Sequence, residues 1–186
     1  MTTDEFEGLI EGASESASLD FKAAMTWSVG SLIKDILAMT NIQDGGRIVV
    51  GVNDDLTRVG LTDDQLASFD EEVMKDQVAE YADPYVLFNV RQAMDRDGLK
   101  YIVINISEFD ETPVICRKGG ADVKRGEVYY RSRSGRPASA HITREHDMRN
   151  VLDRAVIKLM TKRRRQGYEA PETSFDETYK EELGGL

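Results

Sequence analysis

The stretch DGGRIVVGVN, residues 44–53, carries the strongest structural signal in the chain. Asp44-Gly45-Gly46 predicts a turn, because glycine adopts backbone conformations that other residues avoid. No charged residue interrupts the run from Ile48 to Val52, and such a run is typical of a strand covered on both faces. We therefore expect a central strand here, with the rest of the domain packed around it.

Helix and strand patterns follow one another on both sides of this strand. Apolar residues recur with helical spacing over 29–41 and 143–165, while Leu19 to Lys22 alternate as in a half-buried strand. The other expected elements are helices at 4–11 and 62–81, and strands at 85–94, 99–107, 113–118 and 127–133. This mixture, without strict strand–helix–strand repetition, predicts an α+β fold with a mixed β-sheet, packed helices and a long C-terminal helix.

Length and composition indicate one domain in 186 residues, of which 40% are hydrophobic. We expect the domain to span residues 1–165 and the acidic tail, 166–186, to be disordered. The single cysteine excludes an intramolecular disulfide, and no apolar run approaches the ~20 residues of a membrane span. Together with an acidic rather than basic N-terminus, these features predict a cytoplasmic protein without membrane contact.

The net charge of −10 is unevenly distributed. Residues 1–20 hold six acids and no base, and residues 166–186 hold six acids and one base. Residues 115–165 instead hold fifteen Lys and Arg against five acids. A polyanion responds to such local charge, so the overall sign does not exclude nucleic acid. The alternative is a solvated helix face with acidic solubilising ends.

Several catalytic motifs are missing. The chain has no phosphate-binding loop, so no ATP is expected, and GVNDDLTRVG does not match the dinucleotide-binding pattern. It has neither the G-x-S-x-G nor the H-E-x-x-H motif. The spacing of His141 and His146 does not favour a shared metal ion, and Cys116 lacks an obvious base partner.

Four short pieces remain, in this order: Glu15-Ser16 with Leu19-Asp20-Phe21-Lys22; Asn41 before Asp44-Gly45-Gly46; Gly51-Val52-Asn53-Asp54-Asp55 with Val59-Gly60-Leu61; and Tyr129-Tyr130-Arg131-Ser132-Arg133-Ser134-Gly135-Arg136. Together they resemble the Schlafen AlbA-type domain family over about residues 11–140. The chain departs from the family pattern in three places. Asp20 stands where the family usually has Glu, the step from Asn41 to the glycine pair is one residue longer, and Leu56 replaces a frequent Gly.

The resemblance implies RNA or DNA as the partner. Some relatives are endoribonucleases that act on tRNA and rRNA through three carboxylates and a divalent metal. The matching positions are Glu15, Asp20 and Asp54, with Asp55 as the fallback, and they would be both catalytic residues and ligands of Mg²⁺ or Mn²⁺. Hard oxygen ligands suit these ions, which stabilise the charge that develops on a cleaved phosphodiester. The alternatives are a turn cap, ordinary turn acids and an ion pair between Asp20 and Lys22.

The strand expected at 127–133 suggests the nucleic-acid surface. Its alternation places Tyr129, Arg131 and Arg133 on one face, a combination suited to phosphate contact and base stacking. The full set of nucleic-acid-binding candidates is Lys22, Lys118, Lys124, Arg125, Tyr129, Arg131, Arg133 and Arg136. The alternative is an exposed edge hairpin whose charged side chains prevent it from pairing with strands of other molecules. Lys162 to Arg165 are interpreted as a helix end.

Three functions are therefore open. The first is a nucleic-acid-binding protein with metal-dependent endoribonuclease activity, and the second is a non-catalytic DNA-binding regulator. The third is a phage or bacterial inhibitor that acts by protein–protein interaction. The vertebrate relatives combine two such lobes in one chain, so a homodimer is implied here if two lobes are needed.

Overall fold

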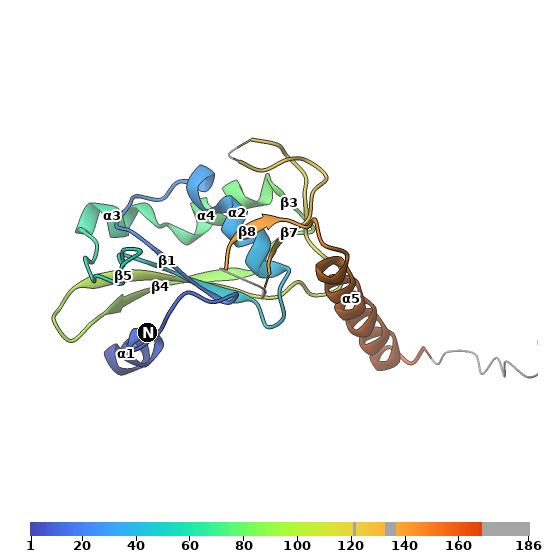
Figure 1. The fold of residues 1–186 in the computed structure, drawn as a ribbon, viewed down its shortest axis with the longest axis horizontal. Coiled ribbons are helices and arrows are strands. Elements are labelled where there is room, and N and C mark those ends of the chain that lie inside the picture. Colours follow the sequence, from blue (N-terminus) through green and yellow to red (C-terminus); the bar gives the residue numbers. More distant parts are fainter. Residues whose placement is uncertain (121, 133–136, 169–186) are drawn as a thin grey trace, which may run out of the picture.

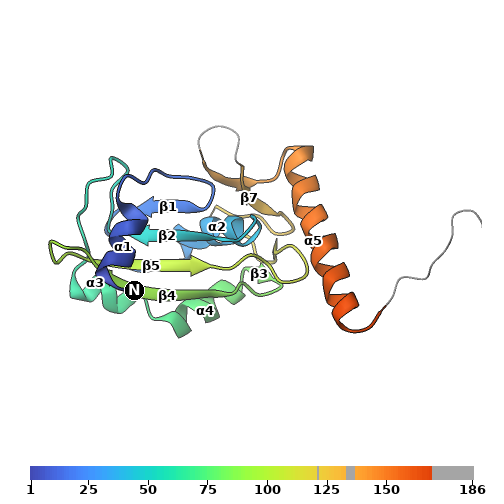
Figure 2. The same ribbon diagram turned by 90° about the horizontal axis from the view of Figure 1, so that it is seen from below.

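A four-stranded sheet forms the centre of the computed structural model, which describes residues 1–120, 122–132 and 137–168 (Figures 1 and 2). The strand order is β1-β2-β5-β4; β1 and β2 are parallel, and the other pairs are antiparallel. The strands are β1 (Leu19–Lys22), β2 (Gly46–Val50), β5 (Lys100–Ile106) and β4 (Phe88–Met94). In the inner strand β2, Ile48, Val49 and Val50 are fully buried, which confirms the expected central strand.

The turn before β2 depends on glycine. Gly45 has a φ of 70°, and a Cβ atom there would lie 2.1 Å from the carbonyl oxygen of Ile106. No other residue fits without moving the backbone of β5. The Asp44-Gly45-Gly46 turn therefore sets how closely β2 approaches its neighbour.

One face of the sheet is covered at one end by helix α1 (Thr3–Ile10), as Figures 1 and 2 show. Phe6 of this helix packs against Tyr101 of β5, with ring centroids 4.6 Å apart. The Tyr101 hydroxyl donates to Asp95 at 2.7 Å. Burial and the Asp95 carboxylate raise the pKa of Tyr101, so this side chain stays neutral in the core.

The opposite face is covered by α2 (Val29–Thr40), α3 (Asp63–Ser68) and α4 (Glu71–Ala79). The prediction of a single helix over 62–81 is wrong, because the helix is interrupted at Phe69 and Asp70. Oδ1 of Asp70 accepts hydrogen bonds from the backbone N–H groups of Glu72 and Val73, both at 3.0 Å. This carboxylate caps the N-terminus of α4, so a second helix begins within a stretch whose hydrophobic spacing predicted one continuous helix.

Two small sheets and a long helix complete the fold, which confirms the α+β class. The small sheets pair β3 (Ala82–Asp83) with β6 (Ile115–Cys116), and β7 (Tyr129–Arg131) with β8 (Ser139–His141). α5 (Glu145–Arg165) lies at the end of the molecule away from α1 (Figures 1 and 2). No helix within the described ranges is long and apolar enough to cross a membrane. Most of the predicted tail lies outside those ranges.

Candidate nucleic-acid interface

Four charged side chains, of which three are buried and Lys22 is half-buried, form a network where β1, α2 and β7 meet. Arg131 is only 1% exposed, and its guanidinium donates to Asp20 at 2.9 Å. Lys22 Nζ lies 2.8 Å from Asp20 Oδ2 and 2.9 Å from Asp35 Oδ2. The Ser139 hydroxyl donates to Asp35 at 2.5 Å, which ties β8 to the same cluster. Two cations and two carboxylates balance within this set, which we call the charge network.

The charge network alters the acid–base behaviour of Lys22. Burial alone would lower the pKa of its ammonium group, but the attraction of Asp35 and Asp20 outweighs burial and raises the pKa. Lys22 therefore stays charged, and its ammonium group is paired with both carboxylates. The expected alternation of Asp20 and Lys22 opposite Leu19 and Phe21 is confirmed, and the ion pair is one of the alternatives that the sequence left open.

The three carboxylates predicted to hold a metal ion do not form a cluster. Asp20 is buried against Lys22 and Arg131, whereas Asp54 is exposed in the turn after β2. Glu15 is half-buried ahead of β1. Nowhere in the described chain are three or more His, Cys, Asp or Glu side chains grouped to hold a metal ion. Glu15, Asp20 and Asp54 therefore do not fit Mg²⁺ or Mn²⁺ in this arrangement, and no catalytic step is derived through them.

The fallback carboxylate, Asp55, has a local role. Its Oδ1 accepts a hydrogen bond from the Thr57 backbone N–H at 2.9 Å. Hydrogen bonds from Thr57 lower the pKa of Asp55, so the carboxylate stays charged while it holds the turn. This is the ordinary use of an acid in a turn.

Three of the predicted nucleic-acid contacts are used inside the protein, and these assignments need correction. Lys22 and Arg131 belong to the charge network. Tyr129 is 3% exposed, and its hydroxyl accepts from the Lys124 backbone N–H at 2.9 Å and lies 3.2 Å from Glu127. Tyr129, Tyr130 and Arg131 are all buried, because β7 lies on α2.

The other predicted cations have mixed outcomes. Lys118 forms an ion pair with Glu80 at 2.5 Å and lies 5.2 Å from the centre of the Tyr81 ring. Lys124 and Arg125 are exposed, so they remain available to a ligand. Arg133 and Arg136 lie outside the described residues.

The motif residue Asn41 connects three parts of the chain. Its side-chain amide donates to the carbonyl oxygens of Leu37, Val114 and Tyr129, at 3.1, 2.8 and 3.0 Å. Its Oδ1 accepts from the Val114 backbone N–H at 2.9 Å. Arg131 also donates to the Ser16 carbonyl oxygen at 3.2 Å. The backbone N–H groups of Gly51 and Val52 also donate to the Lys22 carbonyl oxygen, at 2.8 and 3.1 Å. All four motif pieces are thus joined by hydrogen bonds.

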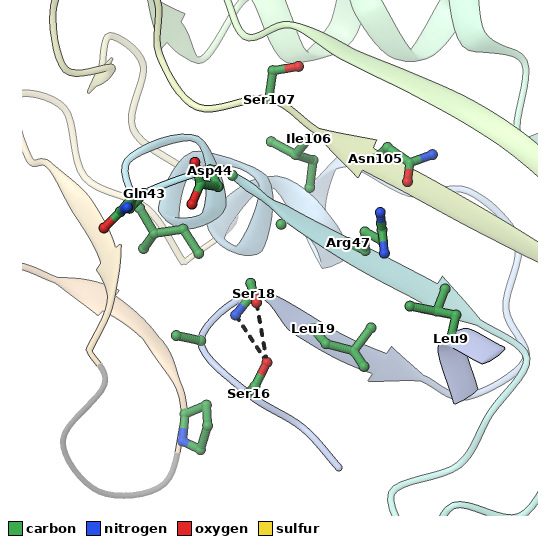
Figure 3. A pocket seen from close by; sticks show the side chains of 15 residues that line it. Leu9, Ser16, Ser18, Leu19, Gln43, Asp44, Arg47, Asn105, Ile106 and Ser107 are labelled. Atoms are coloured by element: carbon green, nitrogen blue, oxygen red, sulfur yellow. Dashed lines mark hydrogen bonds between the residues drawn. The ribbon is translucent and has the colours of Figure 1, made fainter. Parts of the chain in front are cut away.

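An open cleft of about 900 Å³ lies beside these motif pieces (Figure 3). It is bounded by α1, by the starts of β1 and β2, and by the end of β5. The glycine pair Gly45-Gly46 forms part of its wall. The polar residues that line it are Ser16, Ser18, Gln43, Asp44, Arg47, Asn105 and Ser107. We call this space the α1-side cleft.

A row of polar side chains extends from the α1-side cleft across the sheet. Strand register aligns Arg47 with Asn105, and Asn105 with Asn89, and the Asn105 amide donates to Asn89 at 3.1 Å. A second hollow, which shares Leu9, Arg47 and Asn105 with the cleft, extends the surface to Arg91. The eight-residue α1 is too short to cover this half of the face.

Charge on this surface is balanced. Arg47 and Arg91 form no ion pair within the described residues, while Asp44 and Glu5 also line the two hollows. Amide and hydroxyl groups between the charges can both donate and accept hydrogen bonds. None of these residues was predicted from the sequence, although Arg47 lies two residues from Val49, and Asn105 two residues from Val103, and two-residue spacing places side chains on the same face of a strand.

Together these features describe an α+β domain in which half of one sheet face is open and polar. The family model described as Schlafen, AlbA_2 matches residues 15–138, two thirds of the chain, and the chain belongs to this family. The resemblance inferred from the four motif pieces is confirmed. Family membership supports nucleic-acid binding as the general class of function.

Two solved structures are similar to this chain. The DIP2311 protein from Corynebacterium diphtheriae matches with a TM-score of 0.51 and 13% identity, over 79% of this chain and 27% of its own. This chain therefore spans about a quarter of that protein. The N-terminal domain of a RecG-related protein from Nitrosomonas europaea matches with a TM-score of 0.48 and 18% identity, over 78% of this chain and 97% of its own. No curated protein matches the sequence.

Proposed function

We propose that the protein binds RNA or DNA through the α1-side cleft and the polar row beside it. The observation that carries the proposal is the position of the cleft, where Ser16 and Gly45-Gly46 of the family motifs line its wall. A family that shares these motifs shares the surface that they shape. A concave polar surface of this kind is the first place to expect a ligand.

The chemistry of the surface fits a sugar–phosphate chain. Arg47 and Arg91 can each contact a phosphate, while Asn105 and Asn89 offer donors and acceptors to sugars or base edges. With only two arginines, binding depends less on charge than in a basic protein. The logarithm of the affinity should therefore fall with the logarithm of salt concentration with a slope of about −1.4 to −1.8.

The first prediction compares two double variants with the same change in charge. Arg47→Gln with Arg91→Gln is expected to weaken binding to tRNA, single-stranded DNA or duplex DNA at least about tenfold, because two phosphate contacts are lost. Lys124→Gln with Arg125→Gln should change affinity less than about twofold, although it also removes two positive charges. Fluorescence anisotropy across a salt series measures both the affinity and the slope.

The outcomes separate the competing explanations. Loss only in the Lys124 and Arg125 variant would move the interface to the segment first predicted from the sequence. Equal loss in both variants would indicate attraction by general charge. If none of the three nucleic acids binds, the proposal is wrong and a protein-interaction role is favoured. Preference for RNA or for DNA decides between an RNA-directed function and a DNA-binding regulator.

The second prediction concerns cleavage. Metal-dependent endoribonuclease activity is still a prediction from the family resemblance. Because Asp54 lies apart from Asp20, we expect Asp54→Asn to leave unchanged any tRNA cleavage measured with Mn²⁺, and also the affinity for tRNA. Gel analysis with Mn²⁺ or with EDTA provides the measurement. Cleavage that Mn²⁺ supports and Asp54→Asn abolishes would restore the three-carboxylate mechanism.

A further inference from the structure

Helix α5 has one face fixed against the body of the protein. Val151 is fully buried, and Arg154 pairs with Glu108 at 2.5 Å. Lys158 lies 3.3 Å from the same carboxylate, and Lys162 pairs with Glu111. These contacts recur every three or four residues, so they fix how the helix is rotated. The rotation also decides which side chains point away from the body.

The outward side carries an apolar stripe. Leu152, Val156 and Leu159 are 51%, 54% and 36% exposed, and Met160 beside them is 49% exposed. Large apolar side chains gathered on one helix face mark an interaction surface more often than single exposed residues do. The stripe belongs to neither of the two hydrophobic cores.

The spacing along this side is that of a coiled coil. Glu145, Arg149, Leu152, Val156, Leu159 and Arg163 follow one another at intervals of four, three, four, three and four residues. Such alternation keeps one seam of a helix facing a partner helix over its whole length. The three central seam positions are apolar, and the three outer positions are charged.

We propose that α5 pairs antiparallel with α5 of a second copy of this chain, with the two-fold axis beside residue 154. Each seam residue then faces the residue equally far on the other side of the axis. Val156 meets Leu152 of the second copy, Leu159 meets the stem of Arg149, and Glu145 meets Arg163. In a parallel pair, Arg149 and Arg163 would each face their own like charge, which is unfavourable. Charge complementarity therefore selects the antiparallel dimer.

The pairing surface is narrow. Stable protein interfaces bury about 1,200–2,000 Å² in total, more than a single pair of helices can offer when only Leu152 and Val156 meet apolar partners. We therefore expect a dimer with micromolar affinity. Sedimentation velocity of the full chain between about 5 and 500 µM tests this expectation, and a wild-type chain that is monomeric throughout would overturn it.

A matched pair of variants tests the seam. Val156→Glu places a charge at the seam of both copies and should weaken dimerisation at least about a hundredfold. Ile157→Glu makes the same chemical change at the next residue, which is 62% exposed but lies off the seam, and should shift the dissociation constant less than about threefold. Circular dichroism checks that both variants fold. Equal effects, or none, would contradict the proposal.

Charge exchange tests the orientation. Glu145→Arg and Arg163→Glu should each weaken the dimer about three- to tenfold, because each creates two like-charge contacts. The double variant exchanges the two charges and should restore the wild-type dissociation constant. Failure of this restoration would rule out the antiparallel register. Nucleic-acid binding through the α1-side cleft uses none of these residues, so the two proposals can fail separately.

Discussion

Replacing Arg131 by methionine is expected to lower the free energy of unfolding by about 3–5 kcal/mol. Methionine keeps much of the apolar contact of the arginine stem but removes the guanidinium that faces Asp20 and Asp35. Lys22 would then be left with two buried carboxylates. A buried charge without a partner costs far more than the intact pair gains, and this asymmetry explains the size of the effect.

Urea denaturation followed by circular dichroism measures the loss. Arg125→Met is the matched control, because it makes the same chemical change at an exposed position and should stay within about 0.5 kcal/mol of the wild type. Arg131→Lys retains the charge but not the planar guanidinium, so an intermediate loss is expected. If Arg131→Met unfolds within about 1 kcal/mol of the wild type, the charge network does not hold β7 in place.

A double variant separates charge from packing. Asp20→Asn removes one carboxylate, which leaves Lys22 and Asp35 as a balanced pair when Arg131 is also replaced. The loss in Arg131→Met with Asp20→Asn should therefore be smaller than the sum of the two single losses. If the two single losses of unfolding free energy simply add, Arg131 and Asp20 contribute to stability independently, which would contradict a stabilising role for their 2.9 Å contact.

Periodicity in the sequence predicted the large elements, since burial of a helix or strand face repeats at a fixed interval. The uninterrupted run from Ile48 to Val52 contains the end of the buried inner strand β2, and the spacing over 143–165 became α5. Periodicity missed the break at Asp70, where a capping carboxylate acts within an otherwise continuous helical pattern. It also missed β8, which is only three residues long.

The site was harder to predict, because a sequence pattern defines faces without showing what covers them. Tyr129 and Arg131 are both buried in β7, which lies on α2, and Arg131 contacts Asp20 of a distant strand. The polar row is the opposite case. Arg47 and Asn105 share a face with buried residues and are open only because α1 is short. The length of the helix that covers a sheet face, and not the alternation of residues along the strand, decides which of these residues a ligand can reach.

Asn41 illustrates how a family motif can be structural. Replacing it by leucine is expected to lower the free energy of unfolding by about 2–5 kcal/mol, because the buried N–H of Val114 and the carbonyl oxygen of Tyr129 lose their partner. Leucine has a similar volume, so the effect isolates the hydrogen bonds from packing. Urea denaturation gives the total loss, and faster amide hydrogen exchange at Val114 would locate it.

Asn105→Leu is the matched control, since its amide lies on the open polar row and should affect stability by less than about 1 kcal/mol. Asn41→Asp is the sharper variant. It preserves an acceptor for Val114 but turns a carboxylate oxygen toward the carbonyls of Leu37 and Tyr129, so it should cost at least as much as leucine. A stable Asn41→Leu protein would mean that the joined motif pieces hold together without this amide. The shared motif would then have to be explained by ligand binding instead of by the scaffold.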